Sequence, residues 1–246
     1  LCERDAGINV PKQRYADLFF MDKVICNNQL ATMWRRVLRI YPTLILSPVH
    51  RINRLIPGWR SHEIGQNTQQ DRDVHDLFIQ FPPHLMFTDG EIQKGEDHIR
   101  EMGIPKGAAF VCLMVRDNEY LKDLFPTRDY SGHDYRDSNI NNYVLAAEAL
   151  ADRGYFVIRM GAKVKSPLNS SHPKVIDYAF NGMRSDFMDI FLGAHCEFAI
   201  TVGTGIDAVP IIFRRPIVHV NSAPLGYCTT WVEPSLVLAK HHILED

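Results

Sequence analysis

The turn Gly203-Thr204-Gly205 is the stretch of this chain whose residue types best suit the binding of a ligand. It follows an apolar run at 198–202 that has the length and β-branching of a buried parallel strand. Asp207 then falls in the first turn of an expected short helix, where its negative charge suits the helix dipole. Backbone N–H groups of Thr204 and Gly205 would face a phosphate or a sugar hydroxyl. The sequence therefore predicts an anion-binding turn between a strand and a helix.

Two arginines and a further glycine stand at the ends of two other expected strands. Arg116 and Asp117 follow one apolar run, and Arg159 and Gly161 end the next. Because ligands of open α/β sheets bind outside the carboxyl ends of the strands, these residues are expected to share one site with the glycine turn. Two guanidinium groups and two glycine turns suit a diphosphate. A structural salt bridge is an equal alternative for Arg159, and a local ion pair is an alternative for Arg116 with Asp117.

Ser185 and Asp189 open another expected helix, 185–195, and are further candidates for the same site. Ser185 is first of all a helix cap. The long polar loop 116–138 could cover the site as a lid. No aspartate cluster of the DxD kind stands at a strand end, so the sequence favours a site without a metal ion, in which arginines neutralise the diphosphate.

The glycine turn also fits the dinucleotide pattern G-x-G-x-x-A, which would indicate a dehydrogenase. That pattern belongs in the first strand-to-helix turn of its domain, and an acidic residue should follow about 20 positions later. Here the turn comes late in the chain, and the next acidic residue after the following strand is Glu233. Pro210 shortens the helix as well. A dehydrogenase is therefore disfavoured.

Apolar runs that alternate with helical patterns predict an α/β fold in which a parallel sheet is covered on both faces. We expect a doubly wound sheet in residues 104–246 and a less regular first domain in residues 1–103. The expected strands are 15–20, 44–46, 110–115, 156–160, 175–178, 198–202 and 217–220, and the expected helices are 29–40, 88–102, 139–153 and 185–195.

Composition narrows the class of protein. The chain has 246 residues with 27 Lys and Arg against 29 Asp and Glu, so it lacks the basic excess of a nucleic-acid-binding protein. It has no apolar run of the length that spans a bilayer and no visible signal peptide. Five cysteines show no metal-ligand spacing, and Cys112 and Cys196 are expected to be reduced packing residues. We therefore expect a cytoplasmic protein.

Several segments resemble a bacterial family of glycosyltransferases that is linked to surface polysaccharide gene clusters. Among them are MVRDNEYL at 114–121, RSDFMDIFLGAHCEFAITVGTG at 184–205 and RRPIVHVN at 214–221. The resemblance covers nearly the whole chain, and the family is distantly similar to fucosyltransferase-type enzymes. It implies a GT-B architecture of two Rossmann-like halves, with the nucleotide-sugar donor in the C-terminal half. Nothing before Tyr15 fits the opening strand and glycine-rich loop of such a fold, so the N-terminal half looks truncated.

The resemblance also implies that Arg116 contacts the donor diphosphate. From their places at the strand ends, we further expect Arg159 to be a second cation and Asp117 to be a base or a ligand of a sugar hydroxyl. The expected activity is transfer of a sugar from a nucleotide donor to a glycan or lipid-linked acceptor, without a cofactor and with peripheral contact to a membrane as one option. A nucleotide-sugar epimerase of GT-B fold and a non-catalytic nucleotide- or sugar-binding module stay open as alternatives.

Overall fold

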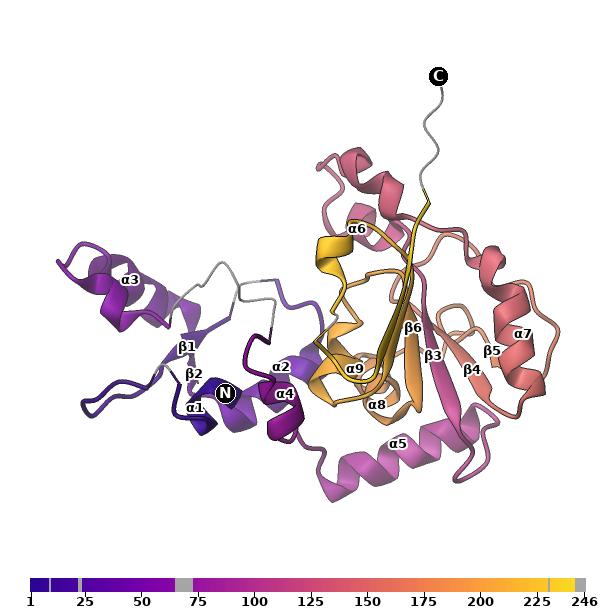
Figure 1. Ribbon diagram of the computed structural model, residues 1–246, viewed down its shortest axis with the longest axis horizontal. Helices are drawn as coiled ribbons and strands as arrows, with labels where there is room; N and C mark the ends of the chain where they lie inside the picture. The colour runs from indigo at the N-terminus through magenta and orange to yellow at the C-terminus, as the bar shows by residue number, and fades with distance from the viewer. Residues whose placement is uncertain (9, 22–23, 65–72, 230, 242–246) are drawn as a thin grey trace. The chain divides into compact units, whose positions relative to one another are not determined.

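The computed structural model describes residues 1–8, 10–21, 24–64, 73–229 and 231–241 (Figure 1). The chain divides into two compact units, Leu1–Met86 and Phe87–Asp246. The sequence places the boundary after the expected helix 88–102, whereas in the structure this helix, α5 (Asp89–Glu101), belongs to the second unit. The reason is close packing, because Gly95 of α5 lies directly against the Phe191 ring of the same unit.

The described residues of the second unit form a six-stranded sheet in which every neighbouring pair is parallel. Numbered along this unit, the spatial order reads 3-2-1-4-5-6, the order of dinucleotide-binding folds. The expected α/β class with a parallel sheet is thus confirmed. In spatial order the strands are β5 (Val175–Ile176), β4 (Phe156–Met160), β3 (Phe110–Met114), β6 (Phe198–Thr201), β7 (Ile217–Ser222) and β8 (Ser235–Ala239).

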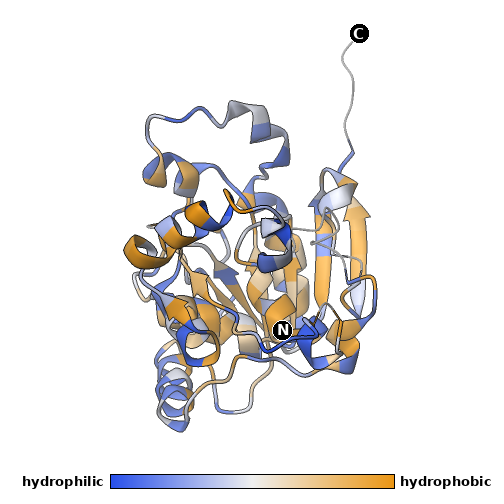
Figure 2. Cartoon of the chain, turned by 90° about the vertical axis from the view of Figure 1, so that its left-hand side faces the viewer, coloured by the Kyte–Doolittle hydropathy of each residue, from blue (hydrophilic) through white to orange (hydrophobic). Residues whose placement is uncertain are grey.

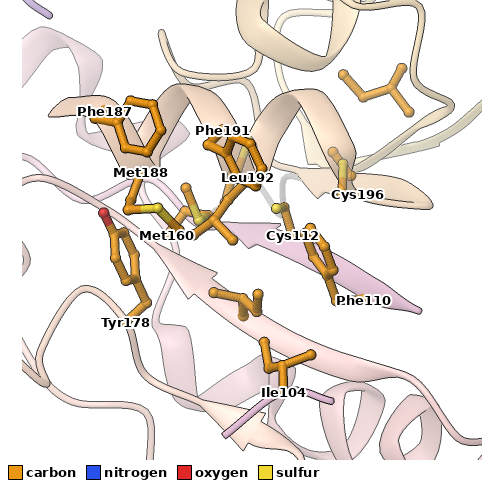
Figure 3. Close-up of a cluster of buried hydrophobic side chains, with 14 of the residues drawn as sticks. Ile104, Phe110, Cys112, Met160, Tyr178, Phe187, Met188, Phe191, Leu192 and Cys196 are labelled. Atoms are coloured by element: carbon orange, nitrogen blue, oxygen red, sulfur yellow. The ribbon is translucent and has the colours of Figure 1, made fainter. Parts of the chain in front are cut away.

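Helices cover both faces of this sheet, as Figure 1 shows. On one face α5, α8 (Asp186–His195) and α9 (Ala208–Ile212) lie over a core to which the strands contribute Cys112, Met114, Ile158 and Met160. Figure 3 shows Phe187, Met188, Phe191 and Leu192 of α8 directed into that core. On the other face α7 (Val144–Asp152) and the 3-10 helix η3 (Ile140–Tyr143) pack on Leu113 and Val157.

The alternation of side chains along the strands explains how one sheet serves two cores. Successive residues of β3 and β4 are buried on opposite faces. Orange, hydrophobic segments accordingly run along the strands in Figure 2, whereas blue segments mark the loops and the outer sides of the helices. Cys112 and Cys196 both lie fully buried as free thiols in the core under α8, as expected, and burial raises the pKa of Cys112.

Two helix starts are fixed by side-chain caps. Thr88 caps α5 through a capping box, in which its hydroxyl accepts the Glu91 N–H and the Glu91 carboxylate accepts the Thr88 N–H. Ser185 caps α8 by accepting the Met188 N–H at 3.2 Å. Each cap satisfies donors that the first turn of a helix leaves without a partner.

The polar segment after β3 is more ordered than a plain loop. It contains α6 (Glu119–Leu124) and the 3-10 helix η2 (Ser131–Arg136). After β7 the chain forms the 3-10 helix η4 (Leu225–Tyr227) and then β8, a strand that the sequence reading did not include.

The first unit has a small sheet of its own, in which β1 (Phe19–Phe20) and β2 (Ile40–Tyr41) pair in parallel. Its helices are α1 (Cys2–Asp5), α2 (Asn28–Val37), α3 (Thr43–Asn53), the 3-10 helix η1 (Trp59–His62) and α4 (Leu77–Gln80). The polar run 62–73 predicts a loop, and most of it lies outside the described residues.

The prediction of a strand at 44–46 is wrong, because these residues belong to α3. The aliphatic run 44–46 taken alone suits a strand, but apolar residues recur at 45, 49, 52 and 56, a helical spacing. A window of three residues is too short to reveal that period.

Candidate functional site

The order of the strands defines where a ligand would bind. From β3 the chain first extends the sheet toward β5 and then returns to place β6 on the other side of β3. In open α/β sheets this reversal creates a crevice at the carboxyl ends of the two strands. Met114 and Thr201 are register partners at those ends, so the segments that follow them lie side by side. Arg116 and the Gly203-Thr204-Gly205 turn are in these segments, so both lie at this edge of the sheet.

Arg116 is held in place by neighbouring polar groups. Its Nε donates to Asp137 Oδ1 at 3.1 Å, and its Nη2 donates to Asn118 Oδ1 at 3.3 Å. Asn118 in turn donates to Asp134. Burial raises the pKa of Asp137, and the positive charge of Arg116 opposes this rise. The ion pair fixes the guanidinium group at the end of β3, and 14% of the Arg116 side chain is exposed.

Arg136 is a second cation at this edge of the sheet, and the sequence reading did not single it out. It ends η2, its Nη2 donates to the carbonyl oxygen of Gly203 at 3.1 Å, and its guanidinium group lies 5.0 Å from the ring centre of Tyr227. Its Nε is buried and has no hydrogen-bond partner among the described residues. In the sequence Arg136 is one of many charged residues in a polar loop, and no spacing distinguishes it from them. Only the folded loop places it on the glycine turn.

The glycine turn is closed by its own acidic residue. Asp207 Oδ2 accepts the Thr204 N–H at 2.9 Å and the Thr201 hydroxyl at 3.0 Å, while Thr201 Oγ1 accepts the Gly203 N–H at 3.1 Å. The Thr204 N–H is thus engaged inside the turn, and the expectation that it faces a ligand is not met in this conformation. The helix that follows is only five residues long. The buried Thr204 hydroxyl oxygen, by contrast, has no partner among the described residues.

Burial raises the pKa of Asp207 to about 6, and the hydrogen bonds from Thr201 and Thr204 act in the opposite direction. In the unfolded chain an aspartate has a pKa of about 3.9. The folded state therefore binds this proton more tightly, and the stability that the group contributes is present at acid pH and is lost as the pH rises toward and through about 6.

We expect Asp207→Asn to remove this pH dependence. Between about pH 5 and about pH 7.5, the free energy of unfolding of the wild type should fall by about 1 kcal/mol relative to that of the variant. Urea unfolding of both proteins at both pH values measures the difference. A constant difference would show that Asp207 has an ordinary pKa in the folded protein.

Arg159 forms the structural salt bridge that the sequence left open as an alternative to phosphate binding. Its Nη1 donates to Asp177 Oδ1 at 3.0 Å, and only 1% of the side chain is exposed. Leu113 is its register partner on β3, so the guanidinium group is buried on the sheet face that α7 covers. The proposed role of Arg159 as a second phosphate ligand therefore does not agree with its position. Arg136, which contacts the glycine turn, lies where the sequence predicts the second cation of the site.

Gly161 is explained by packing rather than by a ligand. A Cβ atom at this position would lie 2.5 Å from Val164 Cγ1, so the loop after β4 can approach only a glycine.

Ser185 and Asp189 belong to a polar cluster at the start of α8. Arg184 Nη2 donates to Asp189 Oδ2 at 2.6 Å, and Tyr178 donates its hydroxyl to Asp189 Oδ1 at 3.1 Å. The Tyr178 hydroxyl also accepts the Ser185 N–H at 2.9 Å. Burial raises the pKa of both Asp189 and Tyr178. These groups satisfy one another, and their contacts assign them to the support of α8.

Asp117 lies next to Arg116 but its carboxylate holds two loops. One oxygen accepts the Glu119 N–H at 3.2 Å, and the other accepts the Lys165 N–H at 3.0 Å. Lys165 follows β4 in the chain, so Asp117 ties the segments after β3 and β4 together at the carboxyl edge of the sheet.

A pocket under α7 is a different feature from this edge. Apolar side chains of α7, β3, β6 and β7 line it, including Leu113, Leu150 and Val220. Without polar groups to orient a substrate, it does not meet the requirements of a specific ligand site.

Within the described part of the chain, no group of three or more His, Cys, Asp and Glu residues could hold a metal ion. No helix there is long and apolar enough to cross a membrane. Comparison of the sequence and the fold with protein families, curated proteins and solved structures finds no match.

Proposed function

We propose that this protein is a metal-independent glycosyltransferase of GT-B type that transfers a sugar from a nucleotide-sugar to a glycan or lipid-linked acceptor of surface polysaccharide synthesis. The resemblance of the sequence to such enzymes supplies the reaction class. One structural observation supports the donor site, namely two arginines at the point where the strand order reverses. Arg116 follows β3, and Arg136 is bound to the turn after β6.

The chemistry of the transfer explains why such a pair would be useful. The bond between the sugar anomeric carbon and the phosphate oxygen breaks, and a new bond forms to an acceptor oxygen that loses its proton. Negative charge then develops on the leaving nucleoside diphosphate. Fixed guanidinium groups stabilise that charge without having to reorganise during the reaction. In this proposal Arg116 and Arg136 bind the diphosphate, and the Thr204 hydroxyl offers a further contact.

The acceptor hydroxyl also needs a group that takes up its proton. Asp117 stays a candidate because a carboxylate oxygen can accept more than one hydrogen bond. Its two backbone contacts would orient it beside Arg116.

Nucleotide binding by Arg116→Ala tests the donor site. We expect binding of the preferred nucleoside diphosphate, chosen from GDP, UDP, dTDP and ADP, to weaken by roughly 10-fold to 100-fold, because a hydrogen bond to a charged group contributes about 1.5–3 kcal/mol. Calorimetry measures the affinity. Arg153→Ala is the matched control, since Arg153 is an exposed arginine at the opposite edge of the sheet. Equal affinities in all three proteins would refute the assignment.

The reaction itself needs a separate test. Incubation with a nucleotide-sugar and an acceptor should release the nucleoside diphosphate only when the acceptor is present. NMR detects the products formed from the nucleotide-sugar alone. An altered sugar or free nucleotide that forms without an acceptor would instead indicate an epimerase. Tight binding without any turnover would indicate a binding module.

A further inference from the structure

Helix α3 carries an apolar face that the first unit leaves exposed. Leu44 is 87% exposed and Leu55, just beyond the helix, is 84% exposed. These are large values for leucine, which is usually buried in folded proteins. The other aliphatic side chains of this face are Ile45, Val49, Ile52 and Ile56, which are between 47% and 61% exposed.

These side chains form one continuous face. Successive residues of an α-helix are rotated by about 100°, and continuing that rotation to residue 56 places all six within an arc of roughly 140°. The opposite side of α3 is occupied by the segment that follows it. His50 Nε2 lies 2.7 Å from Glu63 Oε1, and Arg54 stacks on Trp59 with 4.9 Å from its guanidinium carbon to the ring centre. The helix is therefore fixed within its unit by one side and presents aliphatic side chains on the other.

The stretch of sequence that contains this face is basic. Residues 24–62 contain six arginines and neither aspartate nor glutamate, although the whole chain has a net charge of −2. Of these arginines, Arg54 pairs with Glu63 at 3.3 Å. Arg51 is exposed and lies next to Leu44 and Leu55 on the helical projection. Aromatic residues of the kind enriched at membrane interfaces are present too, with Tyr41 exposed at the end of β2, two residues before α3, and Trp59 after the helix.

We propose that α3 is a membrane-surface helix that inserts its aliphatic face among the lipids of an anionic bilayer, with arginines bound to the lipid phosphates. An amphipathic helix with a large apolar face and basic flanks binds in the plane of the interface without crossing the membrane. The excess of arginine favours an anionic lipid surface over a protein partner of ordinary charge, since basic residues near such a surface add to binding by electrostatic attraction. This proposal is carried by the first unit alone and does not depend on the donor site.

Vesicle binding by Leu44→Ser/Leu55→Ser tests it. We expect the wild type to sediment with vesicles made of equal parts of phosphatidylcholine and phosphatidylglycerol, and more weakly with vesicles of phosphatidylcholine alone. Because the burial of two leucine side chains is lost, the variant should bind the anionic vesicles at least about tenfold more weakly. Its circular dichroism and thermal unfolding should match the wild type, since both side chains are exposed.

Leu145→Ser is the matched control, because Leu145 is 82% exposed on α7 in the other unit, and its vesicle binding should be unchanged. Arg51→Gln should weaken binding to the anionic vesicles and leave binding to the neutral ones unaltered. The proposal is overturned if the wild type does not bind anionic vesicles, or if the double variant binds them as well as the wild type. If the double substitution lowers the mass of the assembly measured by analytical ultracentrifugation but leaves vesicle binding unchanged, α3 is an interface between protein chains instead.

Discussion

Asp177→Ala is expected to lower the free energy of unfolding by about 3 kcal/mol or more. The change removes the partner of a guanidinium group that is almost fully buried, since the Arg159 side chain is only 1% exposed. Breaking a buried ion pair by removing one member is costly because the remaining charge is left in a poorly solvated site. Asp177 also accepts the Leu168 N–H at 2.8 Å, so the variant leaves a backbone donor without its partner. Urea unfolding followed by circular dichroism measures the loss.

Asp152→Ala is the matched control for this experiment. Asp152 also faces a basic residue, with 3.5 Å between its Oδ1 and His172 Nε2, but its side chain is 75% exposed. Its removal should change the free energy of unfolding by less than about 0.5 kcal/mol. In addition, Arg159→Met/Asp177→Asn should be more stable than Asp177→Ala, because neither charge is then left buried alone. If Asp177→Ala is no less stable than Asp152→Ala, the ion pair does not support the sheet.

Gly95→Ala is expected to destabilise the second unit by about 1–3 kcal/mol even though alanine favours helices. An added Cβ atom would lie 2.2 Å from two ring atoms of Phe191, a distance at which something must move. The ring cannot easily move, because it is buried and packs against Phe87, Phe187 and His195. Overpacking of this kind usually costs more than the roughly 0.8–1 kcal/mol that alanine gains over glycine in a helix. The midpoint of thermal or urea unfolding reports the change.

Gly90→Ala provides the internal comparison in the same helix. A Cβ atom at Gly90 meets no atom within 4 Å, so this variant should be neutral or slightly more stable than the wild type. Equal stability of the two alanine variants would show that α5 and α8 are less closely packed than the structure indicates.

Much of the second unit could be predicted from the sequence because its local signals and its tertiary contacts agree. The strands at 110, 156 and 198 are short β-branched or apolar runs bounded by polar residues, and the helices at 88 and 185 begin with side-chain caps. Buried parallel strands need no alternation of polar and apolar residues, so an apolar run of the right length is itself the signal.

The less predictable features depend on contacts between distant residues. The sequence shows that Arg159 lies near the end of a strand, but its pairing with Asp177 follows from where β5 and its flanking loops come to lie. Likewise, Arg136 reaches Gly203 only when the segment after β3, which contains α6 and η2, has folded over the end of β6. The sequence locates the glycine turn between a strand and a helix. The acceptor of the Thr204 N–H, however, is a side chain three residues away, and a pattern of residue types does not show which group will take that hydrogen bond.

The pairing of β3 with β6 has a consequence for the order in which this protein can assemble. The two halves of the candidate donor site come from parts of the chain that synthesis separates widely, since β4, β5 and α8 are all made between β3 and β6. Long-range parallel pairing carries a large loop-closure entropy and slows folding. A growing chain can therefore pair β3 with β4 early, but the proposed donor site stays incomplete until β6 has emerged and docked. The proposed donor site is therefore completed late in folding.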